Sequence, residues 1–300
     1  MALPQLPALV ILRDVGPRDG LQPEPPRTVE ERVRLIEALV DAGVHRIEVA
    51  AFVSPKAVPA MAGAAEVMAF VPRHTIVRYS ALVPNVKGAE LALETDVDEL
   101  TVTMSMSEAY NQRNVHRSIE ESVADVEAIC ALAGEIPVDA VISCAFGSPY
   151  EGDISPRAVG EMVKRLRDVG ASAVTCADTT GMATPKRIED VLSRTGTDVG
   201  LHLHETRGTA LVNAFAAMQL GVDRFDTSIG GLGGSPFAAG AAGNLATEDL
   251  VAVLDDVGVR TGIDLERLLH ASEVAAGLVQ HPLPSRVAVA GPRSRLAGGA

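Results

Sequence analysis

The stretch VGLHLHETRGTALVNAFAAMQLG, residues 199–221, joins a short strand-like run to a longer helix-like segment, and this unit decides the fold. Residues 199–204 have the length and apolar character of a buried strand, and residues 208–221 have helical periodicity. Gly221 supplies the left-handed residue that ends such a helix before the next strand begins. Including this one, the unit occurs eight times along the chain. The expected strands are residues 9–14, 45–50, 75–83, 98–105, 137–146, 172–179, 199–204 and 222–229, and the expected helices are residues 28–43, 59–71, 86–95, 118–134, 155–170, 184–194, 208–221 and 246–258.

Eight strand–helix units in succession predict an α/β chain folded as a (β/α)8 TIM barrel. The alternative for this pattern is a doubly wound open sheet. Its first strand-to-helix turn would carry a GxGxxG motif if it bound a dinucleotide, whereas residues 13–22 are RDVGPRDGLQ. The barrel is therefore favoured. We expect it to occupy residues 1–275, with residues 276–300 forming a short C-terminal helical extension and tail.

Composition narrows the classes of partner. The 300 residues are 47% hydrophobic and carry a net charge of −13, and no basic stripe stands out that could neutralise nucleic-acid phosphates. No apolar run has the length that spans a bilayer, so no membrane partner is expected either. The N-terminus has no signal-peptide pattern, and the three cysteines have no CxxC spacing, which together indicate a cytoplasmic protein with reduced thiols. A homodimer is the commonest oligomer and is kept as a possibility.

Polar side chains fall where a barrel places its chemistry. Active sites of this fold lie at the carboxyl ends of the strands. His202 and His204 end the seventh expected strand and, being two residues apart, point to the same face, into the barrel mouth. Two converging imidazoles are typical of a metal site, and the alternative is a hydrogen-bonded pair of core histidines. The other polar residues at strand ends are Arg18, Asp19, Glu48 and Asp178.

These residue types indicate a particular chemistry. Two histidine nitrogens with the Asp19 carboxylate and a side-chain carbonyl form a mixed site that suits Mn²⁺, Mg²⁺, Co²⁺ or Zn²⁺. The guanidinium group of Arg18 is planar and positively charged, so it can bind a carboxylate or stabilise an enolate. The alternative role of Arg18 is a salt bridge at the barrel rim. Glu48 and Asp178 are candidates for acid–base groups or for residues that orient Arg18 and the histidines, and we favour the orienting role.

Seven segments together resemble a known family. The chain is similar, over roughly residues 8–275 and in the same order, to the 3-hydroxy-3-methylglutaryl-CoA lyases, which are metal-dependent TIM-barrel enzymes. The segments are RDVGPRDGLQ (13–22), FVSPKAVPAM (52–61), LVPN (82–85), SEAYNQRNVHRSIEES (107–122), ADTTGMATP (177–185), HLHETRGTALVNA (202–214) and GLGGSPFAAGAAGNLATEDL (231–250).

The resemblance implies an activity and a set of roles. It implies cleavage of a 3-hydroxy-3-methylglutaryl thioester of coenzyme A into acetyl-CoA and acetoacetate, so the expected partner is an acyl-CoA. It implies Mg²⁺ or Mn²⁺ as the cofactor, and Arg18 as the group that stabilises the enolate. The implied metal ligands are Asp19, His202, His204 and Asn244, and Asn114 is an implied polar contact near the site. Gln22 is a further candidate for substrate binding, and Arg207 is one for the case of a substrate with an extra carboxylate.

The chain departs from the family pattern near the expected chemistry. Ser235 stands where the family has a cysteine that transfers a proton, and a serine hydroxyl is far less acidic than a thiol. Glu205 and Arg207 replace the usual Asp and Tyr after the histidines, and alanines at 50 and 51 replace Thr-Ser. Two alternatives therefore stay open. One is a lyase for another 3-hydroxy acid thioester, of the citramalyl type, and the other is a catalytically silent relative that binds metal and acyl-CoA.

Overall fold

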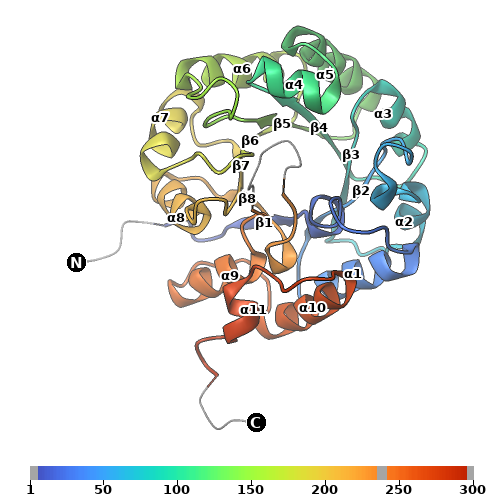
Figure 1. The fold of residues 1–300 in the computed structure, drawn as a ribbon, viewed down its shortest axis with the longest axis vertical. Coiled ribbons are helices and arrows are strands. Elements are labelled where there is room, and N and C mark those ends of the chain that lie inside the picture. The colour runs from blue at the N-terminus through green and yellow to red at the C-terminus, as the bar shows by residue number, and fades with distance from the viewer. Residues whose placement is uncertain (1–5, 235–241, 296–300) are drawn as a thin grey trace.

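Eight parallel strands close into a barrel in the computed structural model, which describes residues 6–234 and 242–295 (Figure 1). Each strand pairs with the next along the chain, and β8 returns to pair with β1. The predicted fold class is therefore confirmed. The strands are β1 (Ile11–Asp14), β2 (Arg46–Ala51), β3 (Arg78–Leu82), β4 (Glu99–Ser105), β5 (Val138–Ser143), β6 (Ala173–Asp178), β7 (Gly200–Leu203) and β8 (Arg224–Thr227).

A ring of helices covers the outside of the barrel (Figure 1). Local sequence signals fix their ends: Thr28 and Glu31 form a capping box at the start of the first helix, and Gly43, with φ of 90°, follows its end. The helices are α1 (Val29–Asp41), α2 (Ala64–Phe70), α3 (Val86–Leu93), α4 (Glu108–Val115), α5 (Ile119–Ala133), α6 (Pro156–Asp168), α7 (Pro185–Thr195), α8 (Ala210–Leu220), α9 (Thr247–Asp256), α10 (Leu265–Leu278) and α11 (Arg286–Ala290). Short helical turns lie at η1 (Gly16–Gly20), η2 (Pro59–Met61) and η3 (Ile229–Gly231).

The main apolar core lies between the strands and the inner faces of the helices. Leu35, Ile36 and Leu39 of α1 are fully buried against this layer. The inside of the barrel is different, because it contains buried charged side chains such as Arg13 and Asp226. Within the described ranges, no helix combines the length and the apolar character needed to cross a bilayer.

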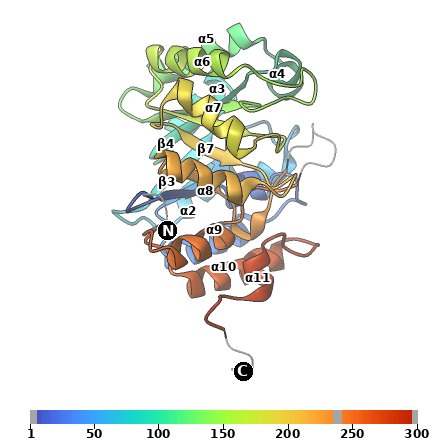
Figure 2. The same cartoon turned by 90° about the vertical axis from the view of Figure 1, so that its left-hand side faces the viewer.

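The last three helices stack on one side of the barrel (Figure 2). Asp249 of α9 holds the start of α11, because its carboxylate accepts hydrogen bonds from Ser285 Oγ and from the Val287 backbone N–H, both at 2.8 Å. The expected boundary at residue 275 falls inside α10, which continues to Leu278. The division of the chain at 275 stays a prediction.

Candidate active site

The turn after β1 brings two charged residues to the barrel mouth. The strand ends at Asp14, whose carboxylate accepts the Gly16 N–H at 2.8 Å and the Thr247 hydroxyl at 2.6 Å. Gly16 is needed there, because a Cβ at this position would lie 2.6 Å from Ile229 Cγ2. The tight turn η1 that follows places Arg18 and Asp19 side by side above the strands.

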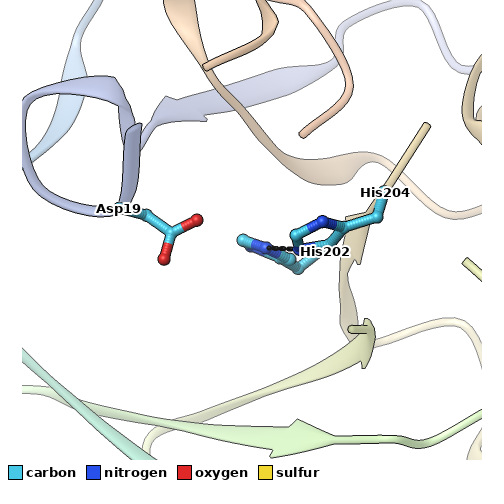
Figure 3. A group of neighbouring side chains, drawn as sticks. All are labelled: Asp19, His202 and His204. Carbon is cyan, nitrogen blue, oxygen red and sulfur yellow. Dashed lines mark hydrogen bonds between the residues drawn. The ribbon is translucent and has the colours of Figure 1, made fainter. Parts of the chain in front are cut away.

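Asp19, His202 and His204 come together over the end of β7, with their side chains pointing toward one another (Figure 3). One potential ligand atom from each residue lies within 4.8 Å of the other two. The Nε2 atoms of the two histidines face each other at 3.1 Å. Each Nδ1 is engaged elsewhere: His202 Nδ1 contacts Asp226 Oδ2 at 3.1 Å, and His204 Nδ1 contacts the Ala242 carbonyl oxygen at 3.1 Å. Both Nε2 atoms are therefore directed at the same space.

This donor set fits a divalent metal ion. Two ligands at about 2.1 Å from one ion, separated by an angle of 90–109°, lie roughly 3.0–3.4 Å apart, which includes the separation of the two Nε2 atoms. Burial and the neighbouring His202 lower the pKa of His204 to about 4, so its imidazole is neutral near pH 7. Burial alone would raise the pKa of Asp19, but Arg18 and the two histidines outweigh it and lower that pKa. A neutral imidazole and an ionised carboxylate are the forms that bind metals.

Arg18 is held by two carboxylates. Its Nε donates to Glu48 Oε2, and its Nη1 donates to Asp19 Oδ1 at 2.7 Å. Glu48 is fully buried within β2 and not at its end, because the strand continues to Ala51. Its contact with Arg18 is compatible with the expected orienting role. The third nitrogen, Nη2, has no partner among residues 6–234 and 242–295, and Arg18 lines the cavity in front of the metal ligands. One face of the guanidinium fork is therefore available to a ligand.

A cavity of about 130 Å³ opens in the barrel mouth between these groups. Gln22 and Asn114, the candidate substrate contacts, both line it. Asp178 does not belong to its lining, although the neighbouring Ala177 and Thr179 do. Instead, one oxygen of Asp178 accepts the Met182 and Ala183 N–H groups at 2.7 and 3.0 Å, and burial raises its pKa to about 7. The cavity also has hydroxyl-bearing walls that the sequence analysis did not single out, formed by Thr101, Thr103, Ser143 and Thr179.

The three remaining expected site residues differ in their position relative to the cavity. Arg207 is exposed and donates from Nη1 to the carbonyl oxygens of Thr180 and Gly181 at 2.8 and 2.9 Å, and it is not among the described residues that line the cavity. Asn244 is buried beside Asp19, and its amide nitrogen donates to Asp19 Oδ2 at 2.7 Å and to the Leu232 carbonyl at 2.9 Å. Ser235 lies outside the described residues.

Comparison with known proteins places this site in a family. The family model described as HMGL-like matches residues 9–275. The chain belongs to the HMGL-like family. It is 41% identical to the 3-hydroxy-3-isohexenylglutaryl-CoA/hydroxymethylglutaryl-CoA lyase of Pseudomonas aeruginosa, over 95% of this chain and 98% of the relative. It is 40% identical to the mitochondrial hydroxymethylglutaryl-CoA lyase of Homo sapiens, over 95% of this chain and 90% of the relative.

Solved structures agree with the family membership. An HMG-CoA lyase of Acinetobacter baumannii, in complex with coenzyme A and 3-methylmalate, is 39% identical to this HMGL-like chain, with a TM-score of 0.92 and 97% of each chain covered. The hydroxymethylglutaryl-CoA lyase of Pseudomonas aeruginosa superposes with a TM-score of 0.90, at 41% identity, over 95% of this chain and 98% of that one. The HMGL-like chain is thus a lyase with a histidine–carboxylate cluster at its barrel mouth.

Proposed function

We propose that this protein is a divalent-metal-dependent carbon–carbon lyase that cleaves 3-hydroxy-3-methylglutaryl-CoA into acetyl-CoA and acetoacetate. The observation that carries the proposal is the cluster of half-buried Asp19 with buried His202 and His204, beside the partly free guanidinium of Arg18, within one cavity. The relatives named above are lyases for this thioester or for it and a longer analogue, and one relative's structure holds coenzyme A. These findings support an acyl-CoA as the substrate.

We propose Mg²⁺ or Mn²⁺ as the metal, with Zn²⁺ or Co²⁺ also compatible with the nitrogen and oxygen donors. Asp19, His202 and His204 would hold it, with Asn244 as a fourth ligand through its amide oxygen. That role requires the Asn244 amide to turn, because its nitrogen now donates to Asp19. A metal ion bound there would act as a Lewis acid on the substrate's oxygens and lower the pKa of its tertiary hydroxyl.

The protein's own residues would stabilise the negative charge that develops on the substrate and supply the proton that ends the reaction. When the tertiary hydroxyl passes its proton to water in the cavity and the carbon–carbon bond breaks, the hydroxyl-bearing carbon becomes the ketone of acetoacetate and the bonding electrons pass to the thioester as an enolate. Arg18 Nη2 would donate to that enolate oxygen, while Glu48 and Asp19 hold the other guanidinium nitrogens in place. Gln22 and Asn114 would orient the substrate from the cavity wall. Ser235 would relay a proton from water to the enolate carbon, to give acetyl-CoA, or would hydrogen-bond the substrate.

A coupled assay for acetyl-CoA tests the proposal. The metal-stripped protein should be inactive with 3-hydroxy-3-methylglutaryl-CoA and should regain activity when Mn²⁺ or Mg²⁺ is added. The same assay with citramalyl-CoA gives the preference of the enzyme between the two thioesters. Arg207→Tyr should leave this substrate preference unchanged, because Arg207 contacts backbone carbonyl groups rather than the cavity. No turnover of either thioester would overturn the proposal. Activity that appears only in Ser235→Cys would instead favour a silent binding relative.

The cytoplasmic location and the homodimer remain predictions from the sequence. Gel filtration with light scattering would decide the oligomeric state.

A further inference from the structure

A chain of buried charges crosses the barrel interior beneath the metal ligands. Arg13, Asp226 and His202 lie on β1, β8 and β7, and they are direct register partners on these neighbouring strands. All three side chains are buried, with exposed fractions of 7%, 6% and 8%. Nothing in the proposed reaction uses Arg13 or Asp226, so their burial calls for another explanation.

Asp226 has its carboxylate fully committed to two neighbours. Its Oδ1 accepts Arg13 Nε at 2.8 Å, and its Oδ2 accepts Arg13 Nη2 at 2.9 Å, which is a two-point contact. The same Oδ2 lies 3.1 Å from His202 Nδ1. Because a carboxylate can only accept, the proton between these atoms resides on Nδ1, which leaves Nε2 as the nitrogen that faces Asp19 and His204.

Arg13 is in turn fixed from its other side. Its Nη2 lies 2.8 Å from Asp139 Oδ2, and its Nη1 lies 3.0 Å from Glu99 Oε1. Thr175 Oγ donates to Asp139 at 2.9 Å and closes the far end of the network. The guanidinium therefore cannot swing away from Asp226 without leaving these carboxylates unpaired in the interior, which is strongly unfavourable.

We propose that Asp226 is a positioning residue that fixes the tautomer and ring orientation of His202 for metal binding, and that Arg13 holds Asp226 in place. Hydrogen-bond partners of metal-binding histidines commonly change metal affinity 10–100-fold when they are removed. The inference rests on the proposed function only in needing a metal at Asp19, His202 and His204. It predicts that metal affinity depends on Arg13 and Asp226, which line the lower part of the same cavity and act on the metal site through His202.

The test compares two isosteric variants of the same buried layer by titrating Mn²⁺ into metal-free protein. Asp226→Asn replaces one carboxylate oxygen by an NH₂ group, which donates and does not accept. The side chain then cannot accept hydrogen bonds from both the Arg13 guanidinium and His202 Nδ1. We expect this variant to bind Mn²⁺ 10–100-fold more weakly than the wild type. Thr175→Val removes the hydrogen bond to Asp139 and leaves Asp226 untouched, so it should bind Mn²⁺ within twofold of the wild type even if its melting temperature falls.

A second measurement reads His202 directly in the metal-free protein. The protein is labelled with nitrogen-15 histidine, and the His202 signal is assigned by its loss in His202→Gln. At alkaline pH, the spectrum of the wild type should show the proton on Nδ1 of His202. In Asp226→Asn, the tautomer with the proton on Nε2 should become more populated. If Asp226→Asn does not fold, Arg13→Lys keeps a cation among Asp226, Glu99 and Asp139 but loses the two-point contact with Asp226, and it should show the same two changes to a smaller extent.

The outcomes separate this inference from the proposed function. Equal Mn²⁺ affinity in Asp226→Asn and Thr175→Val, or an unchanged His202 tautomer, would overturn the positioning role while leaving the lyase proposal intact. A wild-type protein that binds no divalent metal would overturn both.

Discussion

At the scale of single residues, the shape of the Arg18 side chain matters as much as its charge. Arg18→Lys keeps the charge but replaces three nitrogens in a plane with one, so Glu48, Asp19 and the substrate can no longer be contacted together. We expect kcat to fall by about 10²–10³-fold, the usual loss when one donor to a developing oxyanion is removed. Steady-state kinetics measure this. Mn²⁺ affinity of the variant should change little, and an unaltered kcat would contradict the role.

The sequence predicts the placement of some candidate site residues and not that of others. The two-residue spacing of His202 and His204 is enough to put both rings on one face, because strand geometry is regular. The orientation of the Asn244 amide and the outward position of Arg207 depend on which carbonyl groups lie nearby, and no pattern reports that. Arg13 and Asp226 could have been suspected as charges inside the apolar runs ILRD and RFDT. Their pairing depends on the closure of β8 onto β1.

At the scale of elements, the turn η1 sets the position of both Arg18 and Asp19. Gly16→Ala would bring a Cβ to 2.6 Å from Ile229 Cγ2 and 2.8 Å from Asp14 Oδ1, so the turn must shift. We expect a loss of about 1–3 kcal/mol in the free energy of unfolding, together with weaker Mn²⁺ binding. Urea unfolding and metal titration measure the two effects.

Gly277→Ala is the matched control for that prediction. Gly277 lies in α10, and a Cβ there would meet nothing within 4 Å. Alanine should therefore stabilise the helix by about 0.5–1 kcal/mol and leave metal binding unchanged. A destabilisation of equal size in both variants would show that η1 has no special sensitivity.

Regular elements were predictable because their signals are local. All eight expected strands and their helices occur within a few residues of the expected positions, since glycines and capping residues mark the ends. Helix α4 was not predicted as a separate element. Its sequence EAYNQRNV buries only Tyr110 and Asn111, so it lacks the apolar stripe that marks a helix. Helix α10 was also not singled out, because the barrel pattern is already complete at α9.

At the scale of the whole molecule, the pH dependence of stability should include the contributions of buried carboxyl groups, and that of Glu248 can be isolated. Glu248 accepts the Gly230 N–H at 2.8 Å and the Ser272 hydroxyl, and burial raises its pKa to about 7. The folded state therefore holds this proton more tightly than the unfolded chain. The stabilisation that protonated Glu248 adds to the folded state is fully present below about pH 4.5 and is lost as the pH rises through 7.

Glu248→Gln removes that titration. Between pH 5 and 8 the variant should gain up to roughly 3 kcal/mol in unfolding free energy relative to the wild type, measured by urea unfolding at each pH. Glu66→Gln, a change at an exposed carboxyl of α2, should show no such trend. A constant difference between wild type and Glu248→Gln across this range would contradict the assignment.

Metal binding should stabilise the whole barrel, because its ligands join distant parts of the chain. Asp19 follows the first strand, whereas His202 and His204 belong to the seventh, and the segment at Asn244 runs beside His204. An ion that binds only the folded arrangement raises the free energy of unfolding by about 2.7 kcal/mol when its concentration is one hundred times its Kd. In a chain of this size, that raises the melting temperature by about 5 °C. Differential scanning calorimetry with increasing Mn²⁺ measures the shift. His204→Ala removes one ligand and should abolish it, whereas His270→Ala, an exposed position on α10, should preserve it. An equal shift in both variants would mean that the ion stabilises the barrel from somewhere other than this cluster.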